Sequence, residues 1–291
     1  MTAEIPPDKV LRTVRAIEGA LDADWVGAID LQSLLGLIGF CGQILVSGRW
    51  RVPWTVQAMR VAAVHGFAPM NSVWKEELLW WRSLLLEGNI VAMLMGPEFL
   101  IPAHAADVAP FTDACRGSRT GGAGGVFGAR WYEFQFTARE IELLPICDLE
   151  GIASVLWLEE ICERWPEEIA GRRFLAWCDN TTFIGCVNSH KTTIPSLAFL
   201  LGELHRLMAK FSFDLKLVYV KSKDNVAADA LSRLDYDTFR TFMTSKGYDP
   251  AALVRVHIQD SRRDYWSSKM MSYRLLTTEV QKEQKRHSGV D

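Results

Sequence analysis

The sequence predicts an α/β fold, in which a mixed sheet flanked by helices follows a small, mostly helical domain. Three observations predict this class. Residues 1 to about 105 carry apolar residues at spacings of three and four, the period of one helix face. At residues 102–110 the sequence pattern changes from helical to strand-like. Three short apolar or alternating stretches then follow one another, as adjacent strands do. From residue 146 helical and strand patterns alternate, which indicates helices packed on a sheet.

Helices account for the first part of the chain. Apolar residues recur with helical spacing from Val10 to Leu21 and from Leu31 to Ile38. A further helix is predicted over 72–86, with Ser72 as a candidate N-cap and acids in the early turns. Six of the eleven tryptophans lie before residue 105, so we expect a compact helical domain with aromatic packing.

Beyond residue 105 the patterns predict five strands and three helices, and then a tail. From about Asp260 seven Lys/Arg mix with five acids, which predicts a solvated, partly disordered terminus. We therefore expect a helical segment (1–105), a sheet-containing domain (106–240) and a C-terminal extension (241–291). The predicted strands cover 108–114, 121–127, 131–137, 174–178 and 215–220, and the predicted helices 146–165, 192–210 and 227–234.

The glycine-rich run GGAGG at 121–125 has two interpretations. A phosphate-binding loop would need the Lys-Ser/Thr ending of a P-loop or the spacing and context of a dinucleotide fingerprint, and neither is present. Closely packed strands crossed by another backbone, or a turn that needs a positive φ, explain the run better.

Composition narrows the class of protein. The chain has 291 residues, of which 49% are hydrophobic and 23% charged, which fits one or two folded domains and excludes intrinsic disorder. No apolar stretch approaches the roughly 18 residues of a membrane span. The first ten residues do not read as a secretory signal, so we expect an intracellular protein without membrane contact. The six cysteines form no CxxC pair and are expected to be reduced, buried thiols.

Four acids stand where a carboxylate is costly for folding. Asp113 ends an apolar strand, Glu150 begins an otherwise apolar helix face, Asp179 ends the strand over 174–178, and Asp229 opens a helix between alanines. For any one of them, helix capping or solvation is the ordinary reason for its place. If the strands before Asp113 and Asp179 are neighbours, however, all four carboxylates can meet at one place.

Such a cluster implies metal ions. Four negative charges within a few ångströms repel one another strongly at low dielectric, and bound divalent cations relieve that repulsion. Oxygen ligands without His or Cys suit Mg²⁺, or Mn²⁺. A pair of ions about 4 Å apart can activate a water and stabilise the departing oxygen in phosphodiester cleavage.

Four segments carry a specific resemblance. In this order they are FTDACRGSRTGGAGGVFGARW, PICDLEGIASVLWL, AWCDNTTFIGCVNSHKT and VKSKDNVAADALSRL. They resemble the signature blocks of the ribonuclease H domain of retroelement reverse transcriptases, most of all the DIRS-like and gypsy-like branches. The intervals of 37, 29 and 50 residues between the four acids suit that domain, and ADALSR is the most distinctive block. The resemblance covers residues 108–234.

The resemblance implies a fold, a reaction and roles for these residues. The fold would be a ribonuclease H-like mixed five-stranded sheet flanked by helices. Asp113, Glu150, Asp179 and Asp229 would be the catalytic, metal-binding carboxylates, and Asn225 would order the loop before the last of them. The reaction would be cleavage of the RNA strand of RNA–DNA hybrids with two Mg²⁺ (or Mn²⁺) ions, and minor-groove contacts to 2′-hydroxyls would select RNA.

The N-terminal part is similar, more loosely, to the thumb-to-connection segment of the same elements. IPPDKV, LQSLLGLIGFCGQILVSGRW and WKEELLWWRSLL carry this similarity. The sequence contains no YxDD-type polymerase motif and no integrase zinc-binding pattern, so it lacks the polymerase palm and cannot synthesise DNA by itself. We expect a polymerase domain or a partner chain.

The sequence departs from the family pattern in the loop before the last acid. Lys221 and Ser222 stand where many of these elements have Pro-Gly, and the loop histidine of cellular ribonucleases H is missing. His190 lies in a different block and is expected to be a surface or core residue. The missing histidine predicts slower product release, not inactivity.

The net charge of -3 gives no electrostatic argument for binding nucleic acid. Lys/Arg against Asp/Glu number 8 to 10 over residues 1–105, 14 to 17 over 106–233 and 10 to 8 over 234–291, so no region is strongly basic. Four of the 17 acids are the candidate ligands, and bound cations would reverse the local sign around them. We expect weak binding of the remaining hybrid, which a polymerase domain or partner would have to hold.

Two other functions stay open. A domesticated fragment could keep the fold as a catalytically silent binding or scaffolding module, although selection for folding alone would not keep four acids clustered. A transposase or integrase with the same fold would need a three-acid pattern and usually a separate DNA-binding element, and neither is evident.

Overall fold

The computed structural model describes most of the chain. The predicted change from a helical to a strand-like pattern falls largely on residues 101–109, which lie outside the described residues. The predicted domain boundary near residue 105 lies outside them too. The first predicted strand, 108–114, is described only from residue 110. The described ranges are 2–45, 48–86, 91–93, 110–117, 120–170, 173–211 and 213–288.

The chain divides into two compact units, each with its own core. The boundaries between them fall at several places in the sequence, so each unit is assembled from separate segments. Unit 1 comprises Met1–Gly96, His190–Ala198 and Thr277–Asp291, and unit 2 comprises Pro97–Ser189 and Phe199–Leu276.

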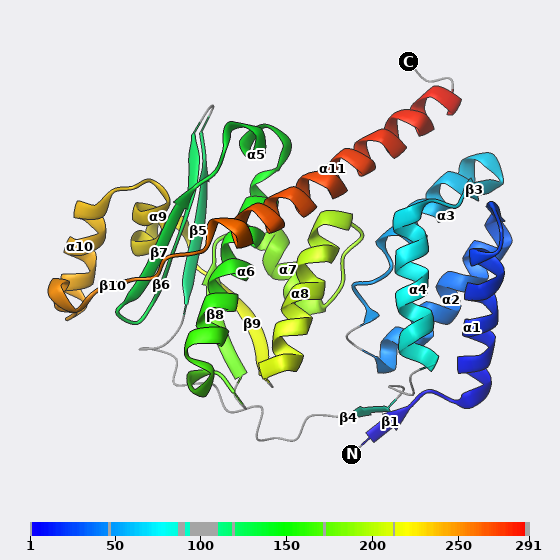
Figure 1. Ribbon diagram of the computed structural model, residues 1–291, viewed down its shortest axis with the longest axis horizontal. Coiled ribbons are helices and arrows are strands. Elements are labelled where there is room, and N and C mark those ends of the chain that lie inside the picture. Colours follow the sequence, from blue (N-terminus) through cyan, green and yellow to red (C-terminus); the bar gives the residue numbers. More distant parts are fainter. Residues whose placement is uncertain are drawn as a thin grey trace. The chain divides into compact units, whose positions relative to one another are not determined.

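In the described part of unit 1, four helices form the core, as the sequence predicts (Figure 1). Helix α1 packs against α2 and α4, and α3 packs against α2. The core is aromatic, with Trp74 and Trp81 fully buried. The helices are α1 (Pro7–Leu21), α2 (Ala28–Ile44), α3 (Pro53–His65) and α4 (Ser72–Leu86), and two antiparallel strand pairs accompany them, β1 (Thr2–Glu4) with β4 (Val91–Met93) and β2 (Trp25–Gly27) with β3 (Phe67–Pro69).

The cap of α4 differs from the prediction. Ser72 is already the first residue of the helix, and the side chain of Asn71 caps it by accepting a 2.9 Å hydrogen bond from the Trp74 backbone N–H. Asn and Ser cap helices by the same chemistry, an acceptor oxygen that reaches the free amides of the first turn. The sequence pattern therefore placed the cap one residue too late.

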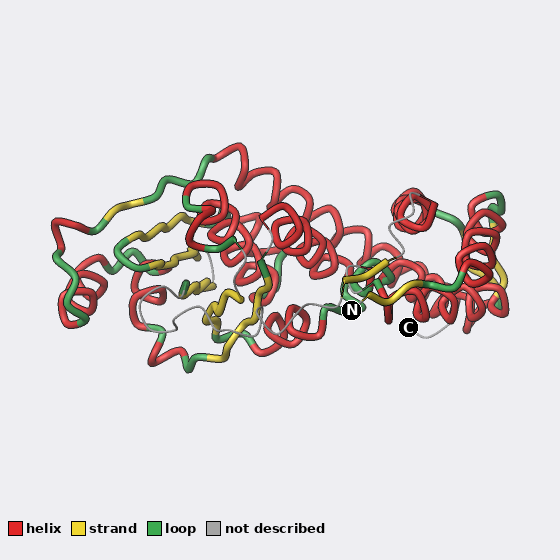
Figure 2. Tube along the Cα trace, turned by 90° about the horizontal axis from the view of Figure 1, so that it is seen from below, coloured by secondary structure: helices red, strands yellow, loops and turns green. Residues whose placement is uncertain are grey.

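The sheet of unit 2 is mixed, and the predicted α/β class and all five predicted strands are confirmed. Figure 2 shows strands in yellow with helices in red around them. Three strands form an antiparallel meander, and two further strands extend it in parallel. A sixth strand at the far edge, β10 (Val254–Arg255), is absent from the prediction because two residues are too short for an alternating pattern. The order is β10-β7-β6-β5-β8-β9, with β5 (Phe111–Arg116), β6 (Gly121–Phe127), β7 (Arg130–Gln135), β8 (Arg173–Cys178) and β9 (Asp214–Tyr219).

Helices cover both faces of this sheet. The Oγ1 atom of Thr112 in β5 lies 2.8 Å from Ser154 Oγ in α6, whereas the next residue, Asp113, bonds to Ser232 of α9 on the opposite face. No helix among the described residues is long and apolar enough to cross a membrane. Between residues 138 and 245 the chain forms the α-helices α5 (Ala138–Leu143), α6 (Ile146–Arg164), α7 (Thr181–Ser189), α8 (Pro195–Phe211), α9 (Val226–Ser232) and α10 (Tyr236–Ser245), of which α6, α7 and α9 contact the strands.

Helix α9 lies directly on the glycine run of β6. A Cβ atom at Gly124 would stand 2.5 Å from Leu231 Cβ and 2.6 Å from Ser232 N, and one at Gly122 would collide with the Ser232 carbonyl oxygen. None of the glycines from 121 to 125 has a positive φ. The run is therefore a strand crossed by another backbone, one of the two structural interpretations that the sequence favours.

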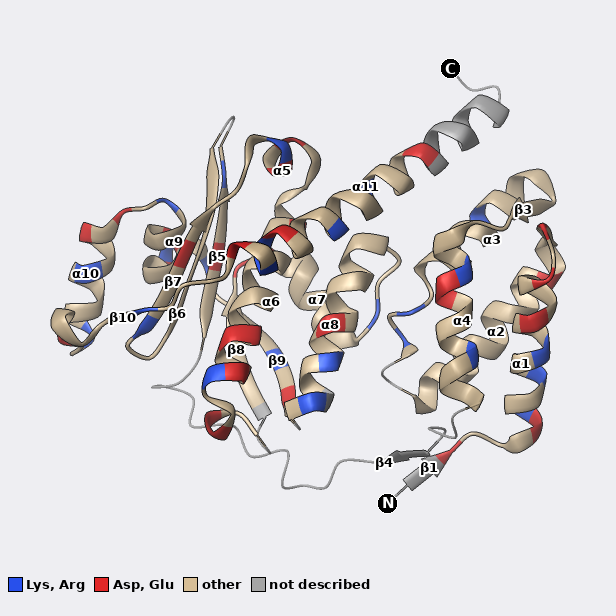
Figure 3. Cartoon of the chain, viewed as in Figure 1, with Lys and Arg blue, Asp and Glu red and all other residues tan. Residues whose placement is uncertain are grey.

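The C-terminal segment differs from the solvated tail that the sequence predicts. Residues from Asp260 to Ser288 form one helix, α11. Within unit 2 its Trp266 and Met270 are buried, and its Arg262 donates to Glu160 of α6 at 2.9 Å. Figure 3 shows the charged residues along these helices. The local mixture of charges looked like a solvated face because the acids that pair with the tail lie about a hundred residues away in the sequence.

Candidate active site

The sheet brings Asp113 and Asp179 side by side. Strands β5 and β8 run parallel, with Phe111 opposite Trp177. Asp113 and Asp179 each lie two residues beyond this pair, so the two acids are level with each other. Asp179 directly follows β8. One detail of the prediction is wrong: Asp113 is the third residue of β5 and not its end, because residues 114–116 continue to pair with the glycines of β6.

Glu150 comes from the first turns of α6 and is 3% exposed. One ligand atom each from Glu150, Cys178 and Asp179 lie within 4.8 Å of one another. Cys178 Sγ stands 4.0 Å from Glu150 Oε2. The expected proximity of Glu150 and Asp179 is thus present. Cys178 is buried and reduced, as expected. Its place next to the two carboxylates was not predicted, although its position beside Asp179 at a strand end was a signal.

Asp229 comes from the first turn of α9. Its charge and that of Asp179 both raise the pKa of Asp113, so the three carboxylates are electrostatically coupled. Arg233, one helical turn later, donates from Nε to Asp229 Oδ1 at 2.9 Å, and both side chains are partly exposed. Asp113 and Asp229 are not members of the 4.8 Å group, so the four acids are gathered more loosely than a single tight cluster.

Burial and like charge shift the acids toward their protonated forms. Burial is the main cause that raises the pKa of Asp113 to about 6; the Ser232 hydrogen bond opposes the rise, and the charges of Asp179 and Asp229 add to it. The pKa of Glu150 lies well above its ordinary range, first because of burial and then because of Asp113 and Asp179. A nearby cation would relieve both effects.

Two serines that hold the acids were missed in the sequence. Ser232 Oγ donates to Asp113 Oδ2 at 2.7 Å, and Ser222 Oγ donates to Asp179 Oδ2 at 2.6 Å. The only sequence signal for Ser232 is its spacing of three from Asp229, which puts both on one side of a helix. Nothing in the local sequence indicates that Ser222 reaches the end of another strand.

Asn225 ties the start of α9 to the sheet. Its Nδ2 donates to the Thr112 carbonyl oxygen at 2.9 Å, and the residue is 1% exposed. Because Thr112 precedes Asp113 and Asn225 precedes Asp229 by one helical turn, this bond sets the two acids relative to each other. The resemblance assigns to Asn225 the ordering of this loop, and that role stays a prediction.

The donor set fits hard divalent cations. The four carboxylates are the oxygen ligands that Mg²⁺ and Mn²⁺ take. Cys178 is a soft donor, which suits Mg²⁺ and Mn²⁺ poorly, and burial raises the pKa of its thiol well above its ordinary value. For Asp229 to bind a cation with both oxygens, it would have to release Arg233.

No protein-family model and no curated protein matches the sequence. Among solved structures, ribonuclease H1 from Halobacterium salinarum is similar at 16% identity and a TM-score of 0.37, over 45% of this chain and 97% of the other. LC11 ribonuclease H1, isolated from compost by a metagenomic approach, is similar at 15% identity and a TM-score of 0.35, over the same shares of the two chains. At such identities the chemistry depends on the side chains that this chain itself places at the site.

Proposed function

We propose that the protein is a metal-dependent endoribonuclease that cleaves the RNA strand of RNA–DNA hybrids. The supporting observation is the gathering of Asp113, Glu150, Asp179 and Asp229, from two strands and two helices, at one place on the sheet. Burying carboxylates that repel one another costs folding free energy. A ligand that needs them explains the arrangement.

In this proposal the four acids hold two Mg²⁺ or Mn²⁺ ions. When bound, such ions activate a water and neutralise charge on the phosphate. The chain's own residues keep the ligands in place: the two serines restrain Asp113 and Asp179 through donated hydrogen bonds, and the Asn225 amide fixes the start of α9. In the absence of cations Arg233 partly neutralises Asp229.

The proposal includes a biological context. We assign residues 1–105 to a thumb or connection-like segment, 106–240 to the ribonuclease H-like domain and 241–291 to an extension, as in a retroelement reverse transcriptase. The net charge of -3 supports a polymerase domain or partner chain that holds the hybrid, because the chain has no basic excess to do so. The protein would act inside the cell.

A cleavage assay tests the reaction. We expect the purified chain with Mg²⁺ or Mn²⁺ to cut the labelled RNA strand of a hybrid and to leave single-stranded RNA and duplex DNA intact. EDTA and the Asp179→Asn substitution should each stop the reaction. An intact hybrid, under conditions in which a known ribonuclease H cuts it, would refute the proposal.

A silent binding or scaffolding module is the second candidate. The observation that favours it is the ion pair between Arg233 and Asp229, which occupies one of the four carboxylates. Thermal unfolding with increasing Mn²⁺ separates the two candidates. A nuclease site should be stabilised by the ion, and Asp113→Asn should remove that stabilisation; a silent module requires neither result.

A further inference from the structure

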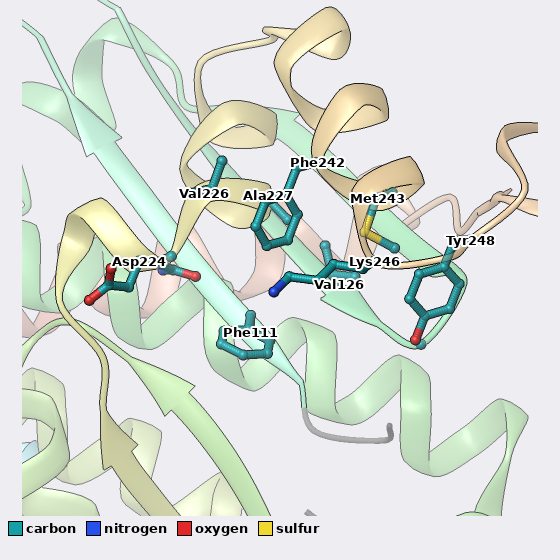
Figure 4. Close-up of a pocket in the computed structure, with 11 residues that line it drawn as sticks. Phe111, Val126, Asp224, Val226, Ala227, Phe242, Met243, Lys246 and Tyr248 are labelled. Atoms are coloured by element: carbon teal, nitrogen blue, oxygen red, sulfur yellow. The ribbon is translucent and has the colours of Figure 1, made fainter. Parts of the chain in front are cut away.

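A cavity of about 310 Å³ lies between the sheet and helices α9 and α10 (Figure 4). Its apolar lining includes Phe111, Val126, Phe242, Met243 and Tyr248. The volume is at the lower end of the range of small-ligand sites, and three of these side chains are aromatic. The cavity therefore has the size and surface for one flat ring system and not for a base pair.

Asn225, which lines this cavity, carries a buried polar atom without a partner among the described residues. Asn225 Nδ2 donates to the Thr112 carbonyl, but Asn225 Oδ1 has no hydrogen-bond partner among the described residues. The amide cannot be turned around, because that would set its oxygen against the carbonyl oxygen of Thr112. A buried acceptor without a partner costs roughly 1–3 kcal/mol. A ligand with an N–H donor would satisfy it.

Lys246 adds a cation to the lining of the cavity. Lys246 Nζ lies 5.3 Å from the centroid of the Phe242 ring, and the residue is exposed. Figure 4 shows the Lys246 side chain reaching between the rings of Phe242 and Phe111, while the Asp224 carboxylate points away from both rings. The rim thus offers a positive charge next to aromatic faces, a combination that recognises a base and its phosphate.

The cavity is next to the candidate active site through two elements. Phe111 precedes Asp113 by two residues on the same side of β5, and Asn225 precedes Asp229 by one helical turn. Trp177 stacks on Phe111 with ring centroids 5.2 Å apart, which holds the Phe111 ring in place. The cavity and the acids are therefore linked through β5 and the start of α9.

We propose that this cavity binds one unpaired nucleobase of the nucleic-acid strand that continues past the cut. A base would displace the Lys246 side chain from between the rings of Phe111 and Phe242, which would then contact its faces. Asn225 Oδ1 would accept one of its N–H groups, and Lys246 would meet the adjoining phosphate. The inference rests on the proposed function for the identity of the strand. Every base has both a flat face and an N–H donor, so the site reads the presence of a base and not its sequence.

Binding to paired substrates tests the proposal. One labelled hybrid carries a short single-stranded extension with bases, and the other carries the same extension with abasic sugars; anisotropy is measured in EDTA, so nothing is cut. We expect the base-containing form to bind about tenfold more tightly, the size of one stacked base. Extensions at either end of either strand locate the preferred side. Equal affinity for the two forms at every position would overturn the proposal.

Three substitutions make the test specific. Phe242→Leu keeps an apolar side chain but removes the ring, and it should bring the ratio of the two affinities close to one. Lys246→Gln should weaken both forms equally and leave their ratio unchanged. Phe211→Leu is the matched control, because Lys210 Nζ lies 4.8 Å from the Phe211 ring at a place outside this cavity. A ratio that persists in Phe242→Leu, or that falls in Phe211→Leu, contradicts the assignment.

Two further measurements distinguish the base site from a free-nucleotide site and from the nuclease itself. Adenosine monophosphate that competes fully for the cavity, with no base preference in the extensions, would assign it to a free nucleotide and overturn the proposal. Because binding is measured without metal, a chain that shows the base preference but no cleavage would refute the proposed nuclease and leave the base site standing. Cleavage without the preference would do the opposite.

Discussion

Two buried glutamates, one in each unit, have opposite surroundings. Glu77 in unit 1 is 2% exposed and accepts hydrogen bonds from the backbone N–H groups of Trp54 and Thr55 and from Thr55 Oγ1. Glu150 in unit 2 is 3% exposed and lies among other carboxylates. Burial raises the pKa of both, but donors oppose the rise at Glu77 and like charges increase it at Glu150.

The difference separates a structural carboxylate from a candidate functional one. At Glu77 the hydrogen-bond donors offset part of the cost of burial, so folding alone explains the residue. At Glu150 the neighbouring carboxylates add to that cost, so the residue needs a reason outside the folded chain. The same substitution at the two positions should therefore have opposite effects.

The largest effect is expected from Glu150→Gln. Loss of a ligand carboxylate should lower hybrid cleavage by roughly a thousandfold or more. Removing one of several repelling charges should leave the metal-free stability unchanged or higher, as measured by urea unfolding. Clear destabilisation of the metal-free protein by this substitution would remove the contrast with Glu77.

Glu77→Gln should destabilise unit 1. The amide nitrogen would face an N–H donor where the carboxylate now accepts, which leaves a buried donor unsatisfied and costs about 1–3 kcal/mol. Far-ultraviolet circular dichroism during urea unfolding measures the change in midpoint. A midpoint equal to that of the unsubstituted chain would show that the three hydrogen bonds do not compensate the burial of Glu77.

The pH dependence of stability should reveal the acids of the site. The ordinary pKa of Asp is 3.8 and that of folded Asp113 is about 6, so between these values the folded chain keeps a proton that the unfolded chain has lost. The contribution of Asp113 is therefore fully present below pH 3.8 and is lost as the pH rises through about 6, by roughly 3 kcal/mol.

The test compares metal-free protein with the Asp113→Asn variant across that range. The difference in unfolding free energy between the two should shift with pH and then level off above about pH 6. Added Mn²⁺ should shift the profile, because the ion and the proton compete for the carboxylates. A constant difference across the range would contradict the raised pKa.

The smallest effect on stability is expected from Arg233→Gln. Its side chain is 60% exposed, and such ion pairs contribute about 0–1 kcal/mol. Apparent affinity for Mn²⁺, however, should rise, because Asp229 no longer has a competing cation. Titration calorimetry checks this, with Lys223→Gln as a control of equal charge change in the neighbouring loop. Weaker Mn²⁺ binding in Arg233→Gln would mean that the arginine helps to hold the site and does not compete with it.

The part of the fold that could be predicted is the part that depends on the residue pattern within single elements. Five of the six strands and the helices α6, α8 and α9 follow from periodicity, whereas α5, α7 and α10 were not predicted. The pairing of Asp113 with Asp179 follows only if their strands are neighbours, a condition that the structure meets. The Asn71 cap, the serines at the acids and helix α11 could not be read from pattern, because each depends on a partner chosen by geometry. The division into a connection segment, a nuclease domain and an extension stays a prediction, as do the catalytic roles of the four acids.

The glycine run under α9 implies an unusual mutational profile. Gly122 and Gly124 have no side chain to offer a metal or a base, yet any side chain there would force α9 away from β6. Asp229 and Ser232 belong to that helix. A substitution that adds a single methyl group to the strand beneath would therefore displace both side chains. A saturation scan scored for cleavage should find these two glycines as intolerant as the carboxylates themselves, through displacement of a helix and not through chemistry.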